Sequence, residues 1–350
     1  MRRQVFRVIK YILLLSATLC LLSVFLPVDY NVPRLQARAG TKYWALPTGS
    51  RIGYTLVRAK GEKKPSPVIF LQGGPGGSIS GRNIAILGQL SENGYDVCLY
   101  DQAGSGFSER LVNIDEYTVA RHVRDLEAIV KNTGAARVIL VGQSWGAILA
   151  TMFVAANPGK VEKLILTSPG PILPVRQKLA GMKAPDSLCL KAPMCTNRQG
   201  NIKVRTLRTR VVTWWALAFG SKLAGDKEAD DFQTLLENEL NKSTVCDSSR
   251  ALKSQGGGGF YASVMTAADF ENVQDPRPML RNSTVPVLIL KGQCDSQQWG
   301  FTNEYLRLFP NHKLVVIPGA GHSISIEQPE MYINAIRSFL TDKNQINTNR

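Results

Sequence analysis

The 350-residue chain has few of the side chains that bind metals, with only three histidines and six cysteines. It contains no Cys-x-x-Cys pair and no His-Glu-x-x-His run, which are typical spacings of zinc ligands. Six cysteines are also too few for a disulfide-dense scaffold of this length. The absence of a 20–50-residue repeat argues against a solenoid or propeller. The sequence therefore predicts a globular protein that uses neither a metal nor another cofactor.

Acidic side chains are in the minority, with 27 Asp and Glu against 42 Lys and Arg and a formal net charge of +15. Such a charge can indicate nucleic-acid binding, but no nucleic-acid-binding motif accompanies it. We therefore expect no nucleic-acid partner. The hydrophobic fraction of 44% is ordinary for a globular protein, and the length suffices for one large core with an insertion.

The first 30 residues have the pattern of an export or anchoring segment. Four basic residues within positions 1–10 precede sixteen uncharged, mostly apolar residues, Tyr11–Leu26. This length lies between a signal-peptide core and a membrane-spanning helix. The following residues make a poor cleavage site, which favours an uncleaved signal anchor over a cleaved signal peptide. The basic flank then predicts a membrane-anchored protein with its body outside the cytoplasm, on the periplasmic side in a bacterium, or a secreted or periplasmic body after cleavage.

Short β-branched runs alternate with amphipathic stretches through the rest of the chain. The predicted core strands are 68–71, 96–100, 138–141, 163–167, 287–290 and 313–317, with edge strands at 43–46 and 52–58 and helices at 118–132 and 328–340. Such alternation predicts an α/β fold with a mainly parallel central sheet flanked by helices.

The alternation stops between Pro169 and Pro286, where the pattern is mostly helical. A long insertion between two late core strands predicts a helical cap over the C-terminal edge of the sheet, where open α/β sheets bind ligands. The run Gly256–Gly259 in this insertion predicts either a hinge or a loose surface loop. Cys189, Cys195 and Cys246 lie in polar surroundings, and the pairing among them stays open.

The strongest chemical motif is Gly142-Gln143-Ser144-Trp145-Gly146, which follows one predicted strand and opens a helix. This Gly-x-Ser-x-Gly pattern is the nucleophile elbow, a turn so tight that its flanks must be glycine. The sequence therefore predicts that Ser144 is an exposed nucleophile above the sheet edge.

A serine nucleophile needs a base, and His322 is the one histidine that follows a late core strand. The acid that orients it is predicted to be Asp295, which follows the strand 287–290. The order serine, aspartate, histidine along the chain matches a known arrangement of the catalytic triad. The glycine-rich Gln72–Gly77 follows another strand, and its backbone is suited to an oxyanion.

These motifs together resemble the prolyl iminopeptidase family of α/β-hydrolases. The shared marks are Gln72–Gly77, Asp101–Ser108, Gly142–Gly146 and the late Asp295 and His322. The resemblance implies an α/β-hydrolase fold and a metal-free serine peptidase that releases an N-terminal residue, typically proline. The oxyanion hole is predicted at the backbone N–H groups of Gly74 and Trp145, with Gly73 as the alternative to Gly74.

The predicted domain organisation follows from this resemblance and from the cap. It comprises an N-terminal anchor or signal peptide (1–30), the first part of the α/β-hydrolase core (40–170), the helical cap (171–284) and the second part of the core (285–342).

Several positions depart from the family pattern. The family usually has histidine where Gln72 stands, arginine where Ala103 stands, and Gly-Arg-x-Asp where this chain has Gly292–Asp295. Its cap tends to carry a Glu shortly after a Trp, whereas Trp214-Trp215 is followed by Ala216. An aminopeptidase needs a carboxylate for the substrate's ammonium group, and Asp269 and Glu271 are the predicted candidates.

Three functions are compatible with these observations. The first is an exported aminopeptidase acting on small peptides, and the second is an esterase, lipase-like or amide hydrolase that uses the same triad. The third is a non-catalytic binding protein, against which the intact Ser144–His322–Asp295 set argues.

Overall fold

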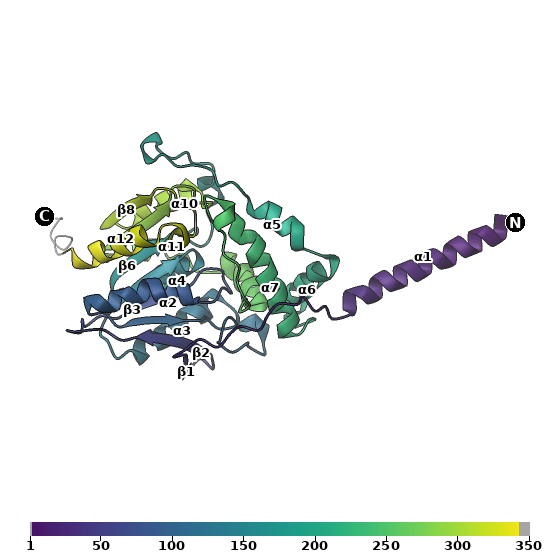
Figure 1. Ribbon diagram of the computed structural model, residues 1–350, viewed down its shortest axis with the longest axis horizontal. Helices are drawn as coiled ribbons and strands as arrows, with labels where there is room; N and C mark the ends of the chain where they lie inside the picture. The colour runs from purple at the N-terminus through teal and green to yellow at the C-terminus, as the bar shows by residue number, and fades with distance from the viewer. Residues whose placement is uncertain (1, 343–350) are drawn as a thin grey trace.

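The computed structural model describes residues 2–342, and these contain one eight-stranded sheet (Figure 1). The strands are β1 (Lys42–Ala45), β2 (Arg51–Val57), β3 (Val68–Leu71), β4 (Val97–Tyr100), β5 (Val138–Gln143), β6 (Val161–Thr167), β7 (Val287–Gly292) and β8 (His312–Ile317). Their order is β1-β2-β4-β3-β5-β6-β7-β8. The pairs β1–β2 and β2–β4 are antiparallel, and the other neighbours are parallel. The predicted fold class is confirmed.

Helices cover both faces of the sheet. They are α2 (Gly81–Leu87), α3 (Val119–Asn132), α4 (Trp145–Ala156), α10 (Trp299–Leu308), α11 (Ile324–Glu327) and α12 (Pro329–Thr341). Because side chains alternate along a strand, Ile69 and Leu71 pack with α3, α4 and α10, while Val68 and Phe70 pack with α2 and α12 on the opposite face. The core strands are buried on both faces, which is why they are apolar without alternation.

The predicted helical cap lies between β6 and β7 (Figure 1). Its helices are α5 (Asn197–Val204), α6 (Leu207–Phe219), α7 (Asp226–Leu240) and α8 (Phe260–Ala268), and the short α9 (Arg277–Leu280) leads back to the sheet. Short 3₁₀ helices are η1 (Gly88–Asn93), η2 (Ile114–Glu116), η3 (Gln177–Leu179), η4 (Asp186–Leu188), η5 (Asn241–Ser243), η6 (Ser248–Arg250) and η7 (Asp269–Glu271).

The glycine run Gly256–Gly259 is a packed junction, so the prediction of a loose surface loop is wrong, whereas the alternative of a hinge stays a prediction. The backbone N–H of Gly259 donates to the carbonyl of Gly76 at 2.8 Å, and the carbonyl of Gly257 accepts from Gly106 at 2.8 Å. A Cβ atom at position 259 would lie 2.2 Å from the carbonyl oxygen of Gly104. The run lacks side chains because its backbone lies directly against the loops that follow β3 and β4.

We expect Gly259→Ala to lower the free energy of unfolding by about 1–3 kcal/mol, because the added methyl group overpacks a rigid backbone contact. The position has φ −114°, so the effect is steric and not conformational. The matched control is Gly159→Ala, where nothing lies within 4 Å of the added Cβ. Urea denaturation of both variants measures the difference, and equal stabilities would contradict the packed junction.

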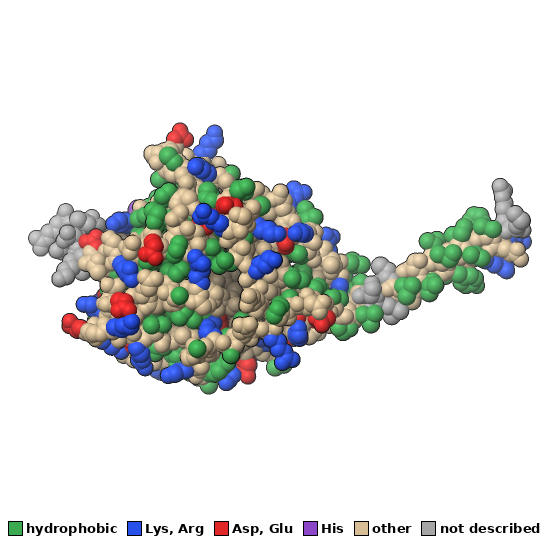
Figure 2. All heavy atoms as spheres, in the orientation of Figure 1, with side chains coloured by type: hydrophobic (Ala, Val, Ile, Leu, Met, Phe, Trp, Pro, Cys, Tyr) green, Lys and Arg blue, Asp and Glu red, His purple; other side chains and the backbone are tan. Residues whose placement is uncertain are grey.

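The N-terminal segment forms helix α1 (Arg2–Phe25), which extends away from the body (Figure 1). Apolar side chains run along most of it (Figure 2). Across residues 2–342, however, no helix is both long enough and apolar enough to cross a membrane. The uncharged Tyr11–Leu26 would reach only about 24 Å as a helix, against a hydrocarbon core of about 30 Å. The predicted membrane anchor, and the membrane-anchored localisation based on it, are therefore wrong.

Candidate active site

Ser144 lies at the turn between β5 and α4 in a strained backbone conformation, with φ 54° and ψ −114°. A side chain at Gly146 would lie 2.0 Å from the carbonyl oxygen of Leu71, and one at Gly142 would lie 2.4 Å from that of Gly146. The two glycines let α4 begin directly against β3, which leaves Ser144 half-buried at the sheet edge. Strain of this kind is typical of a nucleophile elbow.

Asp295 and His322 follow β7 and β8, whose parallel C-terminal ends lie at the same edge of the sheet as that of β5. Nδ1 of His322 is 2.8 Å from Oδ1 of Asp295, and the backbone N–H of Gln297 donates to the same oxygen at 2.9 Å. Both side chains are buried. An imidazole that donates from Nδ1 keeps Nε2 as its proton acceptor, so the structure joins the predicted base and acid in the arrangement that a triad needs.

Lys291 contacts the other oxygen of Asp295. Its Nζ lies 3.1 Å from Oδ2, and both side chains are fully buried. Burial acts to raise the pKa of Asp295, but the Lys291 ammonium group and the imidazole of His322 outweigh it and lower that pKa to about 2. Asp295 is therefore ionised over the whole range in which a histidine base operates.

The loop of residues 72–77 passes directly beside Ser144. A Cβ atom at Gly73 would lie 3.2 Å from Cβ of Ser144, and Gly74 has φ 130°. Trp145 is the first residue of α4, where a backbone N–H has no acceptor within the helix. The predicted oxyanion donors Gly74 and Trp145 therefore lie on the two segments that flank Ser144.

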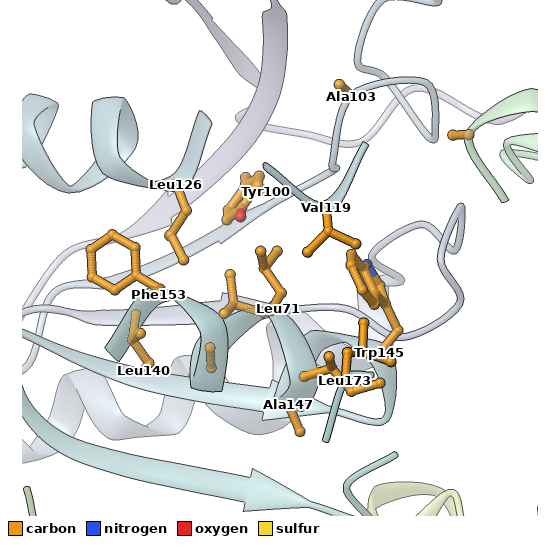
Figure 3. Close-up of a cluster of buried hydrophobic side chains, with 14 of the residues drawn as sticks. Leu71, Tyr100, Ala103, Val119, Leu126, Leu140, Trp145, Ala147, Phe153 and Leu173 are labelled. Atoms are coloured by element: carbon orange, nitrogen blue, oxygen red, sulfur yellow. The ribbon is translucent and has the colours of Figure 1, made fainter. Parts of the chain in front are cut away.

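The side chain of Trp145 holds this edge together. Its indole N–H donates to Oε1 of Gln102 at 2.7 Å, and Nε2 of Gln102 donates to the carbonyl of Gln72 at 2.9 Å. Figure 3 shows Trp145 at the end of a buried cluster, beside Val119 and Leu173. On the cap side, the ring of Phe270 stacks on Trp145 with centroids 5.4 Å apart.

A family model described as alpha/beta hydrolase fold matches residues 66–329. The chain belongs to the α/β-hydrolase family. It is 26% identical over 306 residues to a proline iminopeptidase of Heyndrickxia coagulans, a match that covers 84% of this chain and 96% of that protein. The likeness to solved structures includes an esterase of Exiguobacterium antarcticum (TM-score 0.59, 17% identity, 86% of this chain and 99% of that one). It also includes a proline iminopeptidase of Mycobacterium smegmatis (TM-score 0.55, 21% identity, 86% and 97%).

In this α/β-hydrolase the cap is joined to the acid loop by a disulfide between Cys246 and Cys294. Cys246 therefore pairs with neither of the two partners considered from the sequence, and Cys189 and Cys195 are free. The position of Cys294 next to Asp295 was the one feature of the sequence that pointed to a disulfide near the site. No local pattern indicated that Cys246, 48 residues earlier in the chain, is its partner. Gln293, which replaces the usual arginine, donates to the carbonyl of Cys189 at 3.0 Å.

The cap also holds the loop that carries the hydrolase's histidine. The carboxylate of Glu327 accepts from the backbone N–H groups of Cys246 (2.8 Å), Asp247 (3.2 Å) and Gly321 (2.7 Å). The N–H of Ser323 donates to the carbonyl of Thr244 at 2.7 Å. The segment 244–247 thus contacts the residues on both sides of His322, so the position of the cap and that of the base are coupled.

The two cap acids predicted from the sequence have different surroundings. Oδ2 of Asp269 accepts from the backbone N–H of Val119 at 2.8 Å, at the first residue of α3. Glu271 is exposed in η7. Asp269 therefore already serves the contact between the cap and α3, and the role of the pair in binding an ammonium group stays a prediction.

Glu237 on α7 is a further cap carboxylate, in a stretch whose amino-acid pattern alone is that of an exposed helix surface. Burial raises the pKa of Glu237 to about 7, opposed by a hydrogen bond from Gln233 and reinforced by Asp230. Its side chain keeps some solvent exposure although protein surrounds it on most sides. A carboxylate in such a setting is typical of a functional cleft.

Helix α7 is linked to the C-terminal edge of the sheet by contacts before and after Glu237. One turn earlier, Gln233 lies against Gly258 of the glycine run, which packs on the loops after β3 and β4. Just after the helix, Thr244 contacts Ser323 beside His322. Glu237 lies between these two points in the chain, on the helix face shared with Gln233, whose amide donates to its carboxylate at 3.2 Å.

Within the described residues, no group of three or more His, Cys, Asp or Glu side chains is arranged to hold a metal ion.

Proposed function

We propose that this α/β-hydrolase is a serine hydrolase that acts through an acyl-enzyme. Ser144 is the nucleophile, His322 the general base and Asp295 the residue that orients and stabilises the imidazole. The observation that carries this proposal is the strained turn at Ser144, at the same sheet edge as the 2.8 Å contact between His322 and Asp295. Strain at one polar residue beside a paired histidine is the arrangement that activates a serine.

The steps follow from this arrangement. Oγ of Ser144 attacks the carbonyl carbon while Nε2 of His322 takes its proton. The oxyanion that forms accepts hydrogen bonds from the backbone N–H groups of Gly74 and Trp145. The imidazolium then gives its proton to the leaving amine as the bond to the carbonyl carbon breaks. Water, deprotonated by His322, attacks the acyl-enzyme, and the proton returns to Oγ of Ser144 as the acid leaves.

We further infer that the substrate carries a free amino group, which makes the protein an aminopeptidase that releases N-terminal residues such as proline. Glu237 supports this inference, because a largely buried carboxylate on a cap helix is the kind of partner that a desolvated ammonium group requires. Asp230, the next acid on the inner side of α7, is already paired with Arg110 at 2.8 Å. Glu237 forms no ion pair within residues 2–342, so its carboxylate is the one left to meet an ammonium group.

The test of the substrate class is a comparison of kcat/KM for three matched substrates. These are an unblocked proline arylamide, the same arylamide with an acetylated amine, and a short acyl ester. The proposal expects a preference of at least tenfold for the unblocked arylamide. A preference for the ester, with no discrimination between free and blocked amines, would favour the esterase alternative.

Glu237→Gln is expected to raise KM for the unblocked arylamide by about one to three orders of magnitude, the scale of losing one buried charge pair. KM for the acetylated substrate should change little. In the wild type, the carboxyl group is neutral below its pKa of about 7 and ionised above it. Selectivity for free amines should therefore rise as the pH increases through 7, and this rise should disappear in Glu237→Gln.

The matched control is Glu239→Gln, two residues further along α7, where the carboxylate pairs with Lys203 and Lys242 at the surface. This variant should keep the KM of the wild type. The double variant Asp269→Asn/Glu271→Gln tests the earlier candidates in the same assay. Equal loss on free and blocked substrates in Glu237→Gln would contradict the role of Glu237, and a selective loss in the double variant would transfer that role to Asp269 and Glu271.

A further inference from the structure

Lys291 is a buried basic residue whose side chain contacts Asp295, the acid of the proposed triad. Its side chain is 1% exposed and lies at the end of β7, four residues before Asp295. The ammonium group contacts Oδ2 of Asp295 at 3.1 Å and donates to the carbonyl oxygen of Gln297 at 2.8 Å. Gln297 in turn donates its N–H to Oδ1 of the same carboxylate. Both oxygens of the Asp295 carboxylate therefore have hydrogen-bond partners, Lys291 at Oδ2 and Gln297 and His322 at Oδ1.

A cation at this position changes what Asp295 does for the histidine. In a Ser-His-Asp triad the buried carboxylate stabilises the positive charge that the imidazole acquires. With Lys291 on Oδ2, the charges of Lys291 and Asp295 already cancel before His322 takes up a proton. A proton on the imidazole then brings a second positive charge into a buried site that holds one negative charge.

We propose that Lys291 is a positioning residue that turns Asp295 toward His322 and moves the acidic limb of the pH–rate profile to lower pH. Because protonated imidazole cannot accept the serine proton, a site that disfavours this protonation stays active in more acidic solution. The inference rests on the proposed serine-hydrolase function. At an effective dielectric constant of about 20, a charge several ångströms from the imidazole shifts such a limb by on the order of one pH unit.

Three further carboxylates lie on the elements that follow or lead to these loops. Glu327 of α11 directs its carboxylate to the backbone N–H groups of Gly321 and the segment 244–247. Glu237 belongs to α7, the cap helix that leads to that segment. Glu304 of α10 is paired with Arg277 at 2.8 Å. Variants at Lys291 leave all three in place, so a shift between them reports the charge at position 291.

The experiment compares Lys291→Met, Lys291→Gln and Lys291→Arg with the wild-type protein. Methionine removes the charge and the hydrogen-bond donors, glutamine keeps a donor without charge, and arginine keeps the charge. The reporter is the rate at which Ser144 is labelled by a fluorophosphonate, measured from pH 4 to 9, because this reaction needs the triad but no particular substrate. The kcat and KM for the unblocked arylamide are measured in parallel.

We expect Lys291→Met and Lys291→Gln to move the acidic midpoint upward by about one pH unit, which lowers the labelling rate at acidic pH roughly tenfold. Lys291→Arg should keep the wild-type midpoint. A midpoint that is the same in all four proteins would overturn the inference, as would a loss of rate at every pH that glutamine restores, since that result indicates a purely structural contact.

Two further readouts separate this inference from its premises. Absence of labelling in the wild type would overturn the serine-hydrolase proposal itself, whereas labelling with an unmoved midpoint overturns only the role of Lys291. If the uncharged variants do not fold, the comparison of Lys291→Arg with the wild type decides. A charge-based role predicts the same acidic midpoint in both proteins, and a shifted midpoint in Lys291→Arg would contradict the inference.

Discussion

Ser144→Ala is expected to lower kcat/KM by about 10⁴–10⁶-fold, the scale of losing the nucleophile of an acyl-transfer enzyme. The change removes one oxygen from a half-buried side chain. The strained backbone and the glycines around it are unchanged, so the free energy of unfolding should stay within about 1 kcal/mol of the wild type. Steady-state kinetics on the best substrate and urea denaturation measure the two quantities.

Ser168→Ala is the matched control for this experiment. Ser168 follows β6, the neighbouring strand, and also has a positive φ of 43°. Its buried Oγ has no hydrogen-bond partner among residues 2–342. Alanine at this position should retain nearly full activity and fluorophosphonate labelling. Near-wild-type activity in Ser144→Ala would show that the turn after β5 is not the nucleophile elbow.

Asp295→Asn should lower kcat by about 10⁴-fold, because the amide can neither hold the required imidazole tautomer nor stabilise the imidazolium. It should also reduce stability, which a purely catalytic residue would not do. The substitution leaves the ammonium group of Lys291 buried without a counter-charge, a situation that costs about 3–5 kcal/mol. Kinetics and urea denaturation of the same preparation measure both effects.

The double variant Asp295→Asn/Lys291→Met separates these two effects. Removing both charges should restore most of the lost stability, because no unpaired charge remains in the core. Activity should remain as low as in Asp295→Asn. If the double variant is as unstable as the single one, the contact between Lys291 and Asp295 is not the source of the loss. Wild-type kinetics in Asp295→Asn would mean that another acid orients His322.

The fold was predictable because its determinants are local. The strands of the core are short apolar runs rich in β-branched residues, and the spacing of glycines around Ser144 specifies a tight turn whatever the rest of the chain does. The order of Ser144, Asp295 and His322 along the chain likewise predicted an acid and a base, and the structure brings these two side chains together at 2.8 Å.

The N-terminal helix shows a limit of the same local reasoning. Charge followed by an apolar run predicted a membrane anchor, and the segment is indeed helical. Whether a helix crosses a membrane depends on how many consecutive residues stay apolar, and the sixteen of Tyr11–Leu26 fall short of the hydrocarbon thickness. The remaining part of α1 lies within the first ten residues, four of which are basic.

The amino-acid sequence by itself determined the strands of the sheet and the tight turn at Ser144, since each depends on residues close together in the chain, and it predicted Asp295 and His322 as the acid and base from chain order. Only the tertiary structure decided the pairing of Cys246 with Cys294, the close packing of Gly256–Gly259, and the surroundings of Lys291 and Glu237. Burial and electrostatic pairing of a side chain depend on segments far away in sequence. The local pattern around Glu237 is that of a solvated helix, and only the packing of the folded cap removes most of its solvent.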